Sequence, residues 1–308
     1  MPSVLLHYED QCMRTKKLRG HFRSLAWNRQ DQCLIVGNGG RILRIQNDKI
    51  IDLIAGTRQN LRAVAVNHSN GAALIAGNEG TLLSLDEAGR FIRIDTSTSE
   101  NLRAAAWNDD GSVALVVGNR GVILRHWDHG IKSVDGGRAN LRHVAWRPNR
   151  DQALITSNCF AEEFIPSPNL FSYDARTDHL SSLSEGRADL IGVHWAPAGE
   201  SALVVGYDVV WHNGFIGVLN GTSISPIQFD NKNVYPVTVA WNPAGELAAI
   251  ATATTQPGIG KGTLYLWDKE SLKRAYSNDQ YFFSAVAWDR EGKRLAALAS
   301  SATRTFNC

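Results

Sequence analysis

Short apolar segments separated by turn residues recur along the whole chain. Between residues 101 and 134 they lie at 102–107, 113–117, 122–127 and 131–134. The first two are joined by Asn108-Asp109-Asp110-Gly111, which is typical of a tight turn between antiparallel strands. This stretch therefore predicts a four-stranded antiparallel meander.

The meander repeats seven times, and each copy carries an apolar anchor at the end of its first predicted strand. The anchors are Trp27, Val66, Trp107, Trp146, Trp195, Trp241 and Trp288. They are 39 to 49 residues apart, and four strands at a period of about 40–45 residues are characteristic of a β-propeller blade. We predict an all-β, seven-bladed propeller of four-stranded antiparallel blades in a single domain, 1–308, with the anchors packed in its core.

The two ends of the chain each supply an incomplete unit. The N-terminal strand at 3–9 has no hairpin partner, and the unit at 281–308 has only three predicted strands, at 283–288, 295–299 and 303–306. We expect the N-terminal strand to be the outer strand of this last blade. Closing the ring in this way removes exposed sheet edges.

The predicted blades four to six carry longer insertions than the others. These lie at 158–169, 207–214 and 254–262, always between the second and third strands of a blade. Strands alternate in direction along a meander, so these insertions share one face with the linkers between blades. We call it the top face and expect it to carry the function, because binding residues concentrate on loops.

Composition narrows the function only weakly. The formal charge of +2 and pI near 8.3 are too small to imply nucleic acid or membrane partners. No apolar run approaches a membrane span, and no basic region precedes the short apolar patch at the N-terminus. The four cysteines have no metal-ligand spacing. We expect a soluble cytoplasmic protein.

Several motifs resemble those of the WD-repeat superfamily of seven-bladed propellers. The turns at 240–248 and 287–296 look like that family's first-to-second strand turn, and Leu266-Trp267-Asp268 and His126-Trp127-Asp128 look like its namesake dipeptide. The first three blades, with Leu-Arg-x-Val/Ala-Ala and Gly-Asn-x-Gly, are also similar to the propellers of photosystem II assembly factors. The superfamily resemblance implies a platform for partners.

The sharpest candidate site is a set of arginines at one register, four residues before the anchor. They are Arg23, Arg62, Arg103 and Arg142, while blades five to seven have Ile191, Val237 and Ser284. Linkers on the same face add Arg58 and Arg138. Two interpretations stay open. Each arginine ties its blade to carbonyls of the neighbouring Gly-Asn-x-Gly connection, or the set binds acidic residues, phosphate or another anion.

Two insertions supply further candidates. Glu162 and Glu163 give the blade-four loop an acidic edge, suited either to a partner or simply to solvent. Tyr207, Trp211 and His212 in blade five are candidates for a ligand pocket. His143 and His194 occur singly in first strands, and we find no Ser/His/Asp set, paired acids or metal cluster in shared register. We therefore expect no catalysis, no cofactor and no metal.

These observations favour a non-catalytic scaffold that binds a protein partner, alone or in a larger complex, through the top face. The arginines would oppose an acidic segment or subunit. The alternative is a small-ligand or glycan-binding propeller that uses the blade-five loop. Nucleic acid is disfavoured because no aromatic stacking platform alternates with the basic residues.

Overall fold

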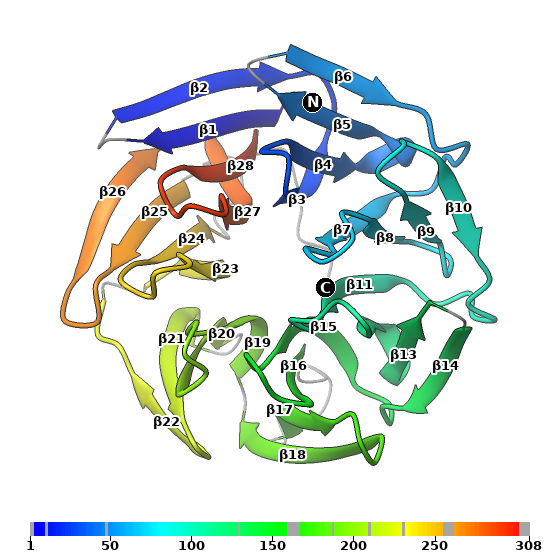
Figure 1. Cartoon of the computed structure of the whole chain (residues 1–308). Coiled ribbons are helices and arrows are strands. Elements are labelled where there is room, and N and C mark those ends of the chain that lie inside the picture. Colours follow the sequence, from blue (N-terminus) through cyan, green and yellow to red (C-terminus); the bar gives the residue numbers. More distant parts are fainter. Residues whose placement is uncertain are drawn as a thin grey trace.

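The computed structural model describes residues 3–301 except 10–11, 47–48, 129, 159–166, 187, 209–210, 230–231 and 255–261. Within them, seven four-stranded antiparallel sheets surround a central channel (Figure 1). The predicted seven-bladed β-propeller is therefore confirmed. Outside the strands, the described residues contain two short 3-10 turns, η1 (Asn38–Gly40) and η2 (Asn119–Gly121).

Blades one to three follow the chain from the channel outwards. Blade one is β3 (Phe22–Trp27), β4 (Cys33–Gly37), β5 (Ile42–Gln46) and β6 (Lys49–Leu53). Blade two is β7 (Leu61–Val66), β8 (Ala73–Gly77), β9 (Leu82–Leu85) and β10 (Phe91–Ile94). Blade three is β11 (Leu102–Trp107), β12 (Ala114–Gly118), β13 (Val122–Trp127) and β14 (Gly130–Asp135).

Blades four to six have the same order, and most of their strands are longer. Blade four is β15 (Asn140–Trp146), β16 (Gln152–Asn158), β17 (Ser167–Asp174) and β18 (His179–Gly186). Blade five is β19 (Ala188–Trp195), β20 (Ser201–Asp208), β21 (Asn213–Asn220) and β22 (Ser223–Pro226). Blade six is β23 (Val234–Trp241), β24 (Ala248–Thr254), β25 (Gly262–Trp267) and β26 (Leu272–Asn278).

Blade seven joins the two ends of the chain and corrects one expectation. From the channel outwards it consists of β27 (Tyr281–Trp288), β28 (Leu295–Ser301), β1 (Ser3–Glu9) and β2 (Cys12–Leu18). The N-terminal segment thus supplies two strands, and β1 is the third strand rather than the outer one. The expected strand at 303–306 lies outside the described residues. An outer strand has solvent on both faces, so the polar β2 lacks the apolar alternation by which strands are recognised.

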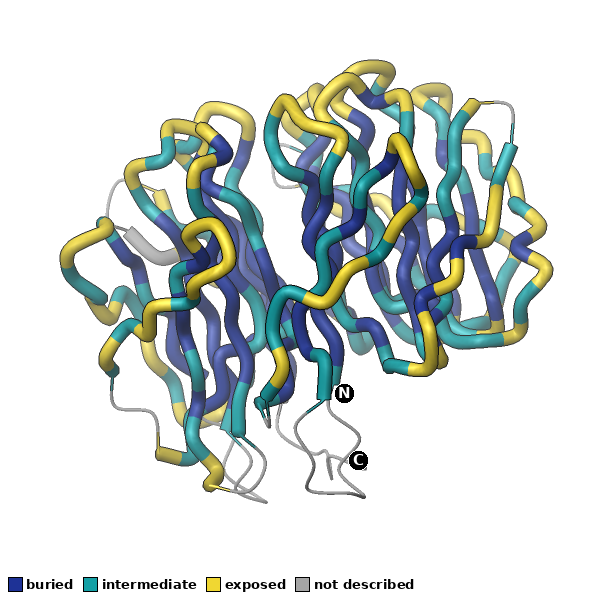
Figure 2. The backbone as a smooth tube through the Cα atoms, turned by 90° about the horizontal axis from the view of Figure 1, so that it is seen from below, coloured by how far each residue is buried: buried dark blue, intermediate teal, exposed yellow. Residues whose placement is uncertain are grey.

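Burial follows the radial stacking of the blades. Every residue of β4, β8 and β12 is buried, because these second strands have a neighbouring blade on each face. Figure 2 shows buried backbone in the middle of the blades and exposed backbone at their turns. The continuously apolar second strands of the blades therefore form the core of the ring.

Three of the six anchor tryptophans donate a hydrogen bond to the preceding blade, whereas the buried indole Nε1 of Trp107, Trp195 and Trp241 has no hydrogen-bond partner among the described residues. The indole Nε1 of Trp27, Trp146 and Trp288 donates to the carbonyl of Ala287, Ala106 and Ala240 respectively, at 3.2, 3.0 and 3.1 Å. Each acceptor lies on the inner strand of the preceding blade. These tryptophans therefore combine burial with a hydrogen bond across the blade interface, as expected for buried indoles.

Candidate functional site: an arginine-lined channel mouth

The four arginines of shared register lie near the start of the inner strands β3, β7, β11 and β15. At each of them the pairing with the second strand shifts by one residue, between the residues that flank the arginine. Each arginine is thus the extra residue of a β-bulge. A bulge leaves one residue outside the ladder and can re-aim its side chain. The same shift occurs at Ile191, Val237 and Ser284 in blades five to seven.

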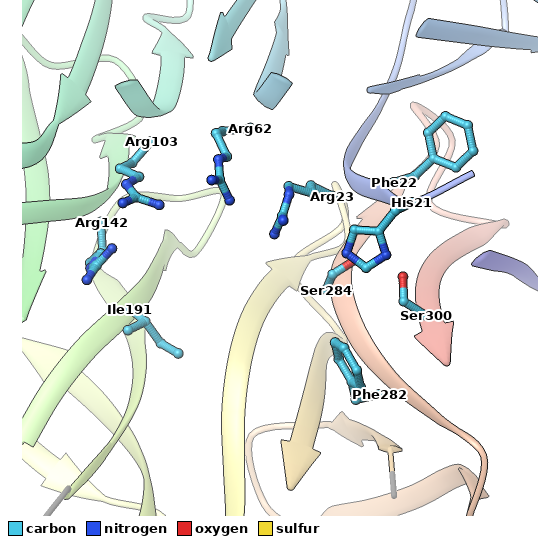
Figure 3. A pocket seen from close by; sticks show the side chains of 10 residues that line it. All are labelled: His21, Phe22, Arg23, Arg62, Arg103, Arg142, Ile191, Phe282, Ser284 and Ser300. Carbon is cyan, nitrogen blue, oxygen red and sulfur yellow. The ribbon is translucent and has the colours of Figure 1, made fainter. Parts of the chain in front are cut away.

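The bulged arginines converge on one pocket, which we call the arginine mouth (Figure 3). It has a volume of about 220 Å³ and opens onto the central channel. Its wall consists of Arg23, Arg62, Arg103 and Arg142 with His21, Phe22, Ile191, Phe282, Ser284 and Ser300. No aspartate or glutamate is among these ten described lining residues.

Each arginine is held by an asparagine of its own blade. Nε of Arg23, Arg62 and Arg103 donates to Oδ1 of Asn38, Asn78 and Asn119 at 2.8, 2.8 and 2.9 Å. Arg142 pairs in the same way with Asn158. The bond uses only Nε, so the planar guanidinium is oriented while its two terminal amino groups extend towards the pocket (Figure 3).

The strut interpretation has the arginines bond carbonyls of the neighbouring Gly-Asn-x-Gly connection. The Nε contacts are with the asparagine side chain of that connection within the arginine's own blade. A contact between blades is made by the asparagine that opens the next inner strand. Oδ1 of Asn60, Asn101 and Asn140 accepts the backbone N–H of Gly39, Glu79 and Arg120 at 3.0, 3.2 and 3.1 Å.

The charges in the arginine mouth repel one another in a partly desolvated setting. Burial, together with the neighbouring Arg142 and Arg62, lowers the pKa of Arg103 to about 10. Burial also lowers the pKa of Arg142, while nearby Tyr207 and Asp189 act in the opposite direction. A negative ligand group would relieve this excess of positive charge.

The other described residues proposed from the sequence do not line the arginine mouth. Arg58 and Arg138 are exposed and do not line the arginine mouth. Glu162 and Glu163 lie outside the described residues. The rings of Tyr207 in blade five and Tyr235 in blade six meet edge to face at 4.9 Å, and Nδ1 of His212 is 3.4 Å from the Tyr235 hydroxyl.

Trp211 belongs to the same part of blade five as Tyr207 and His212. Its backbone N–H donates to Oδ1 of Asp208 at 2.9 Å, and the residue is 68% exposed. Tyr207 is also close enough to Arg142 to influence its pKa. Tyr207 therefore adjoins the arginine mouth, although neither Tyr207 nor Trp211 lines it.

The sequence candidates did not include the asparagines that orient the arginines, nor Phe282 and Ser300 on the other side of the pocket. Gly-Asn or Ser-Asn ends the second strand only in blades one to four, the blades that also carry the arginine. Blades five to seven have Tyr207, Ala253 and Ser300 at that place. This pairing of Arg with Asn was a usable signal. Phe282 and Ser300 could not be found in that way because they occur once.

Below the arginine mouth, the channel has a volume of about 790 Å³ and is lined by inner-strand residues that include His143 and His194. Burial, together with the neighbouring His194, lowers the pKa of His143 to about 4. Burial also lowers the pKa of His194. Nδ1 of His143 has no hydrogen-bond partner among the described residues.

We therefore predict a loss of stability between neutral pH and about pH 4. The unfolded chain takes up a proton on His143 near pH 6.5 while the folded chain resists it until about pH 4. The stability is thus complete above pH 6.5 and decreases as the pH falls through this window, by up to about 3 kcal/mol for His143. Urea unfolding at about pH 7.5 and about pH 4.5 measures it. The variant His143→Asn should lose less, and an equal loss would contradict the assignment.

Within the described residues there is no group of three or more His, Cys, Asp or Glu side chains that could hold a metal ion. The same part of the chain contains no helix long and apolar enough to cross a membrane.

No protein-family model matches the chain, and no curated protein matches it. Among solved structures the chain is similar to Kuenenia stuttgartiensis hydrazine synthase, with a TM-score of 0.71 over 91% of this chain and 95% of that chain. The identity is 12%, so the similarity supports the β-propeller fold and carries no activity across. The resemblances to WD-repeat proteins and to photosystem II assembly factors stay predictions.

Proposed function

We propose that this chain is a non-catalytic binding scaffold that docks an acidic segment of a protein partner on the arginine mouth. The observation that carries the proposal is the convergence of four guanidinium groups on one pocket whose ten described lining residues include no carboxylate. A carboxylate entering this pocket would find charge-assisted donors in a fork geometry that suits it.

The electrostatic gain should exceed that of a surface ion pair. Exposed pairs contribute about 0–1 kcal/mol because water screens them. Arg103 is desolvated enough for its pKa to fall to about 10, so a bound carboxylate there is screened less. The cost of desolvating the arginines has already been met in folding, and this preorganisation favours binding.

The surroundings of the mouth favour a protein over a bare anion as the main partner. Trp211 is 68% exposed on the adjacent blade-five loop, and tryptophan and arginine are enriched in protein interfaces. An acidic segment that fills the arginine mouth could place an apolar side chain on this indole. Within the same proposal we keep the cytoplasmic location, which agrees with the free buried thiol of Cys33.

The test compares two charge reversals of equal size on the same protein. Arg62→Glu with Arg103→Glu changes the arginine mouth, and Arg58→Glu with Arg138→Glu changes exposed linker arginines outside it. A fluorescein-labelled oligoglutamate peptide reports binding by anisotropy, and affinity purification from the source cells reports the partner. We expect only the first double variant to lose the partner and to bind the peptide at least tenfold more weakly. The affinity of the wild-type protein for the peptide should fall with added salt.

Equal loss in the two variants would refute specific docking at the arginine mouth, as would retained binding in a folded first variant. A change in melting temperature identifies a variant that fails to fold. The charge-retaining variant Arg103→Lys then replaces it, because it loses the guanidinium fork without adding a negative charge. We expect this variant to bind more weakly than wild type.

A second candidate function rests on the exposed indole of Trp211. Its loop is held by the Asp208 contact, and Tyr235 and His212 lie close together next to it. An indole with polar neighbours suits stacking against a small ligand such as a sugar ring. Quenching of tryptophan fluorescence by a ligand from a glycan array, lost in Trp211→Ala, would favour this function over protein docking.

A further inference from the structure

We propose that the arginine mouth is also a binding site for a small free oxyanion of two or more charges, which competes with the acidic partner group. The chemistry is that of phosphate or of a di- or tricarboxylate. The competition rests on the proposed function, whereas binding of the oxyanion concerns this chain alone.

The size of the pocket supports a small ligand. Its volume of about 220 Å³ lies below the roughly 300–1,000 Å³ of sites for drug-sized molecules. The described wall is built from this chain alone, with residues from blades one to five and from blade seven. Arg23 to Arg142 line one arc, and Ile191, Phe282 and Ser284 lie on the other (Figure 3).

The charge of the pocket favours ligands that carry more than one negative charge. Four arginines face a space in which no described lining residue is acidic, so a monovalent anion would leave most of the positive charge uncompensated. The lowered pKa of Arg103, caused by burial and then by Arg142 and Arg62, shows that these charges act on one another. Each added negative charge on one ligand therefore gains attraction without a further entropic cost of association.

The donors are also oriented in advance. Asn78 and Asn119 each fix Nε of an arginine at 2.8 and 2.9 Å, which sets the plane of the guanidinium. The terminal amino groups can then bond two oxygens of one ligand as a fork.

The experiment measures the melting temperature of the whole chain at constant ionic strength while chloride is replaced by other anions. We expect a saturable rise with inorganic phosphate or citrate, and little change with acetate. Phosphate and citrate in separate titrations distinguish the two ligand sources. An equal rise with acetate, or no rise with either polyvalent anion, would overturn the proposal.

Three variants locate the effect. Arg62→Gln with Arg103→Gln should abolish the shift, while Arg58→Gln with Arg138→Gln should retain it. Asn119→Ala leaves all four charges but releases Arg103, and we expect roughly three- to tenfold weaker binding of the stronger anion, since a single hydrogen bond is worth about that much. If all variants shift like the wild type, the oxyanion acts elsewhere on the protein and the proposal is wrong.

The oligoglutamate assay separates this proposal from docking. Displacement of the peptide by phosphate or citrate, but not by acetate at the same ionic strength, supports competition at one site. If the peptide binds while neither polyvalent anion shifts the melting temperature, the docking function is supported and the oxyanion site is refuted. If the peptide fails to bind while an anion shifts the melting temperature, the oxyanion site stands alone.

Discussion

Replacing Gly80 with alanine is expected to reduce the free energy of unfolding by about 3–5 kcal/mol. The residue has φ +62°, and a Cβ built on it would lie 1.8 Å from the carbonyl oxygen of Thr98. The linker holding that carbonyl is fixed by two bonds of 2.8 Å, from the Gly80 N–H to Glu100 and from the Thr96 hydroxyl to Gly80. The clash must therefore move the segment that joins blade two to blade three. Urea unfolding measures the change.

The matched control is Gly39→Ala in blade one. Gly39 also has a positive φ, +68°, but a Cβ there would meet nothing within 4 Å. Glu79 and Arg120 hold the equivalent position in blades two and three, with φ of 52° and 51°. Only the left-handed backbone opposes alanine there, at about 1–2 kcal/mol. Equal costs at Gly39 and Gly80 would show that backbone conformation, not the close approach of the linker, makes glycine necessary.

The repeat itself predicts most of the fold. A second strand buried on both faces has to be apolar at every position, as in Ala114–Gly118, and an anchor at constant spacing marks each blade. These features arise from stacking seven similar sheets, so each copy supports the assignment of the others. One sequence of 308 residues therefore contains several independent observations of the same fold.

The order of strands in blade seven could not be read in the same way. Its outer strand, Cys12–Leu18, pairs only with β1 and has the sequence Cys-Met-Arg-Thr-Lys-Lys-Leu. No neighbouring blade imposes an apolar pattern on an outer strand, as the mostly exposed Lys49–Leu53 also shows. Pairing between the two ends of the chain depends on backbone hydrogen bonds, which produce no periodic pattern of apolar residues in the sequence.

The candidate site was predicted as a set of residues but not as a geometry. The shared register of the four arginines is visible in the sequence, whereas the β-bulge that aims them is defined by the loss of one pairing step. Likewise, the Gly-Asn-x-Gly motif is visible in the sequence, but it does not indicate that Asn119 orients Arg103. A turn residue and a binding residue differ here only in the direction of one side chain.

Trp146→Ala is expected to reduce the free energy of unfolding by about 3–5 kcal/mol. Trp146 is 7% exposed, its ring meets Tyr173 edge to face at 6.3 Å, and its indole donates to Ala106 in blade three. Truncation removes core volume and leaves the Ala106 carbonyl without this donor. Urea unfolding should show the loss at an unchanged slope with denaturant concentration.

Two further substitutions divide that loss into its causes. Trp146→Phe retains most of the apolar volume and removes the hydrogen bond, so about 1–2 kcal/mol is expected. Trp211→Ala, at a residue 68% exposed, should change stability by no more than about 0.5 kcal/mol. If Trp146→Phe costs as much as Trp146→Ala, the bond between blades dominates. If Trp146→Ala costs no more than Trp211→Ala, the anchors do not hold the ring together and its stability resides within the individual sheets.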